Sequence, residues 1–98
     1  MPSTITLPGL ADDVVRFGGW RADRPDYFAQ YEQGQTVRAG RGWRYTVTLS
    51  DDAADDLRDY LISVRDALAS MTFEERGVDG SSDLRAVRAT LDRWPVNA

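Results

Sequence analysis

The chain has 98 residues, of which 42% are hydrophobic and 29% charged, and its net charge is −4. It contains no cysteine, histidine or lysine, so all 12 cationic side chains are arginines. These absences exclude disulfides, thiolate or imidazole zinc sites, cysteine nucleophiles, histidine acid–base catalysis and Schiff-base lysines, and leave only carboxylate chemistry, alone or with oxygen-ligated Mg²⁺ or Ca²⁺.

The first part of the chain predicts strands. Residues 4–7 are a candidate strand. Residues 14–17 and 20–22 flank Gly18-Gly19 in the manner of a tight hairpin, although Leu10, Val14 and Phe17 also share one helical face. We favour the hairpin.

A short helix and a second hairpin follow. Residues 24–33 contain an early proline and aromatic residues at helical spacing, and Gly34 follows them, which is typical of a short helix. Residues 43–49 alternate apolar and polar side chains, as a half-buried strand does. Residues 36–39 are the expected partner strand, joined to it through a glycine-containing loop.

The second half predicts two helices. Ser50 is placed to cap a helix over residues 51–71, whose first turns are rich in aspartate, and Ser82 to cap another over residues 83–94 after a loop at 77–81. We therefore expect one domain, residues 1–98, with an α+β fold: a small antiparallel sheet from the N-terminal half (1–49) packed against a C-terminal antiparallel helix pair (50–94).

Four aspartates of the long helix share its outer face, with one isoleucine among them; this predicted acidic face comprises Asp52, Asp55, Asp59, Ile62 and Asp66. Such rows usually solvate a helix. An apolar residue ringed by acids also resembles the centre of a docking surface for a basic partner protein. A row of carboxylates could instead mimic the phosphates of a nucleic acid.

Arginines and aromatic residues alternate on the second hairpin. Arg38, Arg41, Trp43 and Arg44 could contact phosphates and stack on bases. The alternative is that Trp43 and Tyr45 face the core while Arg38 and Arg44 lie on the opposite, solvated face of the sheet. Because an acidic chain is not a general nucleic-acid binder, any such role must be local.

Two acidic motifs suggest metals but do not fit them. Residues 51–55 spell the DDxxD pattern of prenyl-transferring enzymes, yet the chain has no second acidic motif and no volume for a prenyl cavity. Residues 79–83 resemble the start of a calcium loop, but Thr90 stands where its bidentate glutamate is needed. We expect no cofactor and no metal.

The arginine-only basicity and the abundance of alanine, aspartate and glycine, together with a strand at residues 44–50 that runs into a capped acidic helix, resemble small uncharacterised proteins of actinobacteria and their bacteriophages. The resemblance covers residues 43–94 and carries over no active-site residue. It implies a compact accessory protein that acts by binding.

We therefore expect a non-enzymatic protein-interaction module that self-associates or docks on a partner protein. The alternatives are a nucleic-acid-binding regulator using the hairpin of residues 38–45, and an acidic mimic of nucleic acid. No stretch approaches the ~20 apolar residues of a membrane span, and the start of the sequence lacks a signal-like pattern, so we expect a cytoplasmic protein without membrane contact.

Overall fold

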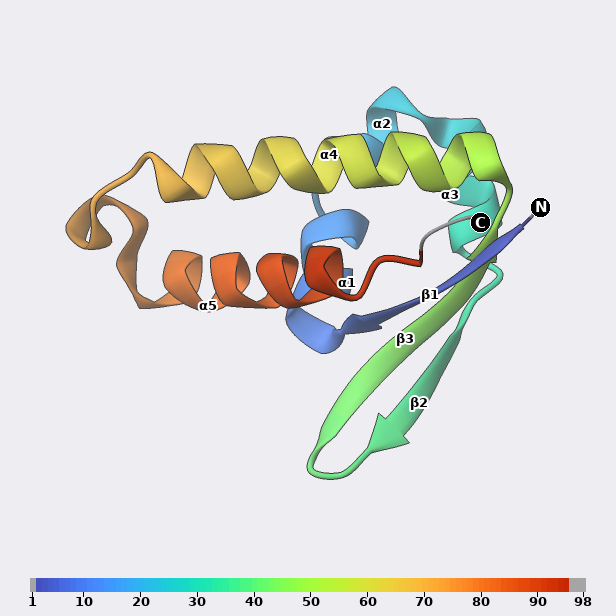
Figure 1. Ribbon diagram of the computed structural model, residues 1–98, viewed down its shortest axis with the longest axis horizontal. Coiled ribbons are helices and arrows are strands. Elements are labelled where there is room, and N and C mark those ends of the chain that lie inside the picture. The colour runs from blue at the N-terminus through green and yellow to red at the C-terminus, as the bar shows by residue number, and fades with distance from the viewer. Residues whose placement is uncertain (1, 96–98) are drawn as a thin grey trace.

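The computed structural model describes residues 2–95, and these form an α+β fold in which a three-stranded antiparallel sheet packs beside an antiparallel pair of long helices (Figure 1). The central strand β3 lies between β1 and β2. The elements in chain order are β1 (Ser3–Pro8), α1 (Gly9–Arg16), α2 (Trp20–Asp23), α3 (Pro25–Tyr31), β2 (Gln35–Ala39), β3 (Gly42–Leu49), α4 (Asp51–Ala69) and α5 (Phe73–Asp92).

Where helices cover the sheet, its side chains alternate between buried and exposed, as the sequence predicts. On its inner face β1 and β3 bury six neighbouring side chains, whereas the outer face carries threonines. The hydroxyls of these threonines pair across the strands, with Thr4 and Thr48 3.0 Å apart and Thr6 and Thr46 3.2 Å apart. The buried inner residues are Ser3, Ile5, Leu7, Tyr45, Val47 and Leu49.

Helix α4 begins where the sequence predicts, because the Ser50 side chain accepts a hydrogen bond from the Ala53 amide (3.4 Å). Its buried residues Ala53, Leu57 and Leu61 recur every fourth position and face the core. The helix ends at Ala69, two residues before the predicted end at Met71, and Met71 is exposed.

Helix α5 begins ten residues earlier than predicted. The Thr72 hydroxyl accepts from the Glu75 amide while the Glu75 carboxylate accepts from the Thr72 amide, a capping box that starts the helix at Phe73. Gly77, with φ of 72° and ψ of −179°, is not helical and separates a first turn at residues 73–76 from the longer helix at residues 78–92. The loop expected at residues 77–81 is therefore wrong except at Gly77, because residues 78–81 already belong to the helix that follows the kink.

The hairpin predicted around Gly18-Gly19 is wrong: residues 9–16 and 20–23 are helical. Ala11 and Val15, one helical turn apart, are buried against the core, and this packing overrides the strand preference of the valines. Gly18 closes the turn where α4 approaches, and the Tyr60 hydroxyl donates to the Val14 carbonyl at 3.0 Å. The short helix expected at residues 24–33 is confirmed as α3.

None of the helices within residues 2–95 combines the length and apolarity that a membrane crossing requires.

Replacing Gly18 by alanine tests this helical interpretation. A Cβ at position 18 would lie 1.9 Å from the Tyr60 hydroxyl and 2.4 Å from the Val14 carbonyl oxygen, so Gly18→Ala should lower the free energy of unfolding by about 2 kcal/mol or more. At Gly19 the nearest atom would be an Asp23 carboxylate oxygen at 3.9 Å, so Gly19→Ala should change stability little. Urea unfolding measures both; equal effects would contradict the packing described.

Candidate functional site

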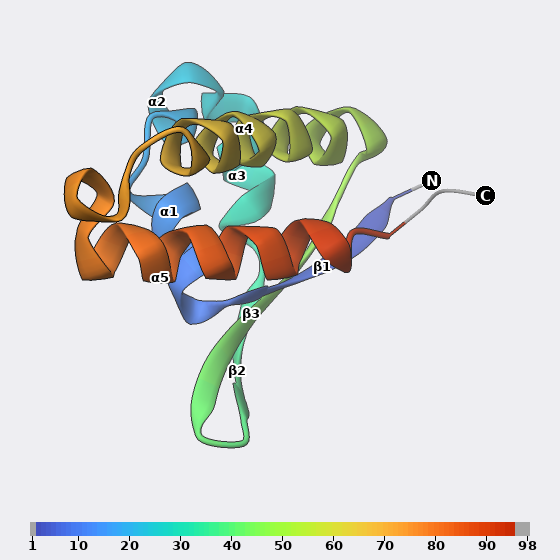
Figure 2. The same cartoon turned by 60° about the vertical axis from the view of Figure 1, so that its left-hand side comes forward.

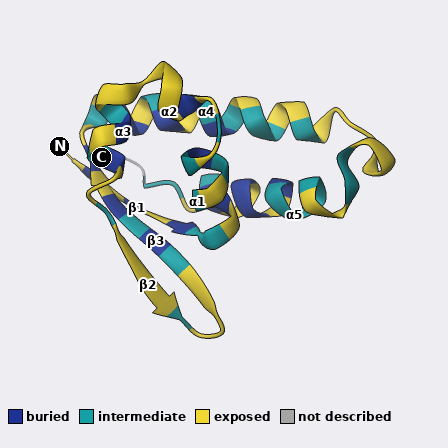
Figure 3. Cartoon of the chain, turned by 180° about the vertical axis from the view of Figure 1, so that it is seen from behind, coloured by how far each residue is buried: buried dark blue, intermediate teal, exposed yellow. Residues whose placement is uncertain are grey.

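The β2–β3 hairpin extends beyond the core as an arm, here defined as residues 35–49 (Figures 1 and 3). On β3 burial ends abruptly: Tyr45 is 4% exposed and Trp43, on the same face, 58%. Every residue of β2 is exposed except the half-buried Ala39, and Val37 is 48% exposed. The arm therefore presents apolar surface that the monomer does not use.

The arm turns through Gly40 and Arg41. Gly40 has a φ of 62°, whereas no non-glycine residue in the described part of the chain has a positive φ, so the turn has the glycine-first pattern of type II′. A two-residue turn makes the flanking Ala39 and Gly42 a hydrogen-bonded pair, and such pairs alternate along a hairpin. The backbone groups of Thr36 and Arg38 consequently point away from β3.

The outer edge of β2 is thus an open sheet edge. The opposite edge of the sheet, along β1, is covered by α5 (Figure 2). By the same alternation of hydrogen-bonded pairs, the backbone nitrogen of Pro8 faces outward, and proline has no amide proton to leave unpaired there. Within residues 2–95, β2 makes extended contact with β3 alone. Thr36 and Arg38 therefore offer unpaired amide and carbonyl groups to solvent or to another strand.

The arm carries all four residues predicted for nucleic-acid contact. The Arg38 guanidinium lies over the Trp43 ring, 5.8 Å from its centre, and the two residues are direct partners across the strands. The expectation that Trp43 faces the core is wrong, because Tyr45 is the last residue on this face of β3 that the core covers. The expectation that Arg38 and Arg44 share a face is also wrong, because the register puts Arg38 beside Trp43 and Arg44 on the opposite face.

A buried polar cluster fixes the base of the arm. The Tyr45 hydroxyl donates to the backbone carbonyl of Tyr31, whose own hydroxyl donates to Asp12 at 2.5 Å. Arg16 pairs with the same carboxylate (3.3 Å) and lies over the Tyr45 ring, 5.0 Å from its centre. These contacts tie α1 and α3 to β3 at the point where burial ends.

The aspartates of the predicted acidic face are exposed, but the isoleucine at its centre is not. Asp52, Asp55, Asp59 and Asp66 are all exposed on α4, whereas Ile62 is half-buried. Asp66 is bonded to the neighbouring Arg65 at 3.1 Å. Without an exposed apolar centre, this face offers charge but little area for protein docking.

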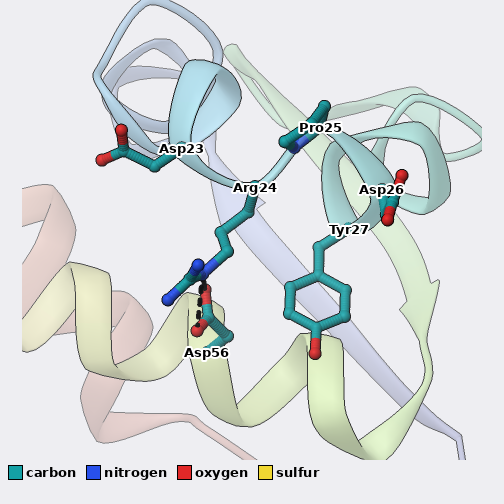
Figure 4. A pocket seen from close by; sticks show the side chains of 6 residues that line it. All are labelled: Asp23, Arg24, Pro25, Asp26, Tyr27 and Asp56. Atoms are coloured by element: carbon teal, nitrogen blue, oxygen red, sulfur yellow. Dashed lines mark hydrogen bonds and ion pairs between the residues drawn. The ribbon is translucent and has the colours of Figure 1, made fainter.

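A hollow beside α2 and α3 is lined by three carboxylates, those of Asp23, Asp26 and Asp56, but they do not face one another as a catalytic pair would (Figure 4). Asp56 accepts hydrogen bonds from the Trp20 indole (2.8 Å) and from Arg24 (3.2 Å), so it links α2 to α4. Asp23 and Asp26 lie on either side of Arg24 and Pro25 and point away from each other. No cluster of three or more potential metal-ligating side chains occurs among residues 2–95.

Exposed apolar residues also gather at the turn between α4 and α5, namely Met71, Phe73 and Val78. This patch lacks the open backbone edge that accompanies Val37 and Trp43 on the arm. We therefore take the arm as the candidate site.

Sequence reasoning did not single out Val37, nor Arg85 and Arg93 of α5. The alternation of residues 36–39 predicts which face Val37 takes but not how far the core reaches. The eight-residue spacing of Arg85 and Arg93 places them on one side of a helix, yet only the packing of α5 beside β1 brings them near Arg44.

Comparison of the chain with protein-family models, with curated proteins and with solved structures gives no match. The resemblance to small actinobacterial and phage proteins stays a prediction.

The polar cluster around Tyr31 and Asp12 predicts that the folded protein loses stability at alkaline pH. Burial, and then the hydrogen bond to Asp12, raises the pKa of Tyr31 far above the ordinary tyrosine value. The unfolded chain loses this proton near pH 10 while the folded chain keeps it, so the free energy of unfolding should fall as pH rises above about 10. Urea unfolding at several alkaline pH values measures the slope.

Tyr31→Phe should reduce this slope without abolishing it, because burial also raises the pKa of Tyr60. At neutral pH the same variant should lose about 1–3 kcal/mol, since Asp12 loses a buried donor. An unchanged alkaline slope in Tyr31→Phe would show that the cluster does not hold this proton.

Proposed function

We propose that this chain is a non-enzymatic protein-interaction module that self-associates by pairing the open edge of β2 with β2 of a second copy. The observation that carries the proposal is the projection of the arm, with an unpaired strand edge and exposed Val37 and Trp43, beyond the core. A chain without cysteine needs no oxidising compartment to fold, and we propose that it acts in the cytoplasm.

The edge of β2 is self-complementary. In an antiparallel pair centred on Val37, that residue faces Val37 of the second copy, and Thr36 faces Arg38. The outward amide and carbonyl groups of Thr36 and Arg38 then bond to each other across the pair. No arginine stands opposite another arginine, so the alignment avoids like-charge repulsion.

A pair of this kind converts two three-stranded sheets into one continuous six-stranded sheet. The pairing gives hydrogen-bond partners to the outward amide and carbonyl groups of β2, and it covers part of both Val37 side chains. The contact is small, because each copy contributes five residues of β2, so we expect a reversible dimer with a micromolar or weaker dissociation constant.

Substitutions at Thr36 separate the backbone contribution from the side chain. Thr36→Pro removes an outward amide while leaving the bonds to β3, so two intermolecular hydrogen bonds vanish per dimer. At about 0.5–1.5 kcal/mol each, their loss should raise the dimer dissociation constant about 5- to 150-fold. Thr36→Val keeps the amide and the β-branched shape and should dimerise like the parent chain. Sedimentation velocity over a concentration series measures all three proteins.

Circular dichroism and urea unfolding check that both variants are folded. A parent chain that stays monomeric up to about 1 mM contradicts the proposal. Equal weakening by Thr36→Pro and Thr36→Val contradicts the role of the backbone edge.

A further inference from the structure

A positively charged groove runs along the outer face of the sheet beside α5. Thr4, Thr6 and Arg44 line it from the sheet, and Arg85 and Arg93 line it from the helix. Figure 2 shows α5 lying alongside β1. It shares only Arg44 with the hairpin residues predicted from the sequence to contact nucleic acid.

The groove is cationic although the chain is acidic. Its lining includes three arginines and no carboxylate, and within residues 2–95 none of these arginines forms an ion pair. The charges are also segregated along the sequence: residues 33–50 and 84–95 hold six of the 12 arginines but only one of the 16 acidic residues, Asp92. The nearest acids on the sheet side are Asp12 and Asp13, which line an adjoining hollow that shares Arg44 with the groove. Asp92 lines an adjoining hollow that shares Arg85 and Ala89 with the groove.

The spacing of the charges suits an extended anion. Arg85 lies in α5 and Arg93 caps its C-terminal end eight residues later, which places their backbones about 12 Å apart along the groove. Arg44 adds a third cation from the opposite wall. Guanidinium groups bind phosphate oxygens through two parallel hydrogen bonds, so three arginines along one groove can contact more than one phosphate of a chain.

The threonines supply further donors. Each hydroxyl carries one proton, and within each of the pairs Thr4 to Thr48 and Thr6 to Thr46 only one hydroxyl can donate to the other. One proton per pair therefore remains for a ligand. Apolar side chains, among them Leu10, Ala86 and Ala89, complete the lining, so it is the arginines and hydroxyls that favour a phosphate ligand.

We propose that this groove binds the phosphodiester backbone of a nucleic acid. The inference does not rest on self-association, because the groove lies within one copy of the chain. The acidic remainder of the molecule restricts contact to this face, so binding is local and strongly dependent on salt.

Fluorescence anisotropy with a labelled 20-nucleotide single strand and with a 20-base-pair duplex tests the proposal at about 20–200 mM salt. The parent chain should bind at least one of them at low salt. The triple variant Arg44→Gln, Arg85→Gln, Arg93→Gln should bind at least about tenfold more weakly, and its log–log salt slope should be shallower by about 2. The two probes distinguish single-stranded from duplex backbone as the source of the phosphates.

The matched control is Arg21→Gln, Arg58→Gln, Arg65→Gln, which makes the same change in net charge at residues outside the groove. It should retain most of the affinity. Circular dichroism checks folding, and the single reversal Arg85→Glu provides a milder variant that should also weaken binding.

Three results would overturn the proposal: no salt-sensitive binding to either probe, equal loss of affinity in the triple variant and its control, or binding of polyglutamate as tightly as of the oligonucleotides. The last would identify the groove as a general acidic-polymer site.

Discussion

Tyr45 packs on Tyr31 with ring centres 4.8 Å apart, and its hydroxyl bonds to the Tyr31 backbone. This contact marks the end of the core. The helices cover the sheet as far as Tyr45, and the next inward-facing residue of β3, Trp43, is exposed. A chain of 98 residues has a limited apolar core, and here that core does not extend beneath the whole hairpin. The open edge of β2 follows from that limit.

The two proposed surfaces are geometrically compatible. In the antiparallel pairing of β2 with its copy, residues opposite each other keep their side chains on the same face, so the two-fold axis is perpendicular to the sheet. Arg44 of both copies then lies on one face of the continuous sheet, as do both grooves. Self-association would place two cationic grooves on the same side of the assembly and would strengthen binding to a polymer through effective concentration.

The sequence predicts the elements whose signals are local. Ser50 and the alternation of residues 43–49 were sufficient for α4 and β3, because a cap and a two-residue period act over a few positions. The helices at residues 9–23 were missed because Val14 and Val15 favour strands until Ala11 and Val15 are packed against the core. The exposure of Trp43 and the approach of Arg85 to Arg44 depend on where helices lie, which no local pattern records.

Amide hydrogen exchange measured residue by residue, at low and high protein concentration, tests most directly the claim that the uncovered arm pairs through its edge. The account predicts that the amides of Thr36 and Arg38 exchange rapidly in dilute solution and become protected as concentration rises, while those of Val37 and Gln35 are protected throughout. Exchange at Thr36 and Arg38 that is rapid at every concentration, or protection that appears instead on the outer face of α4, would contradict it.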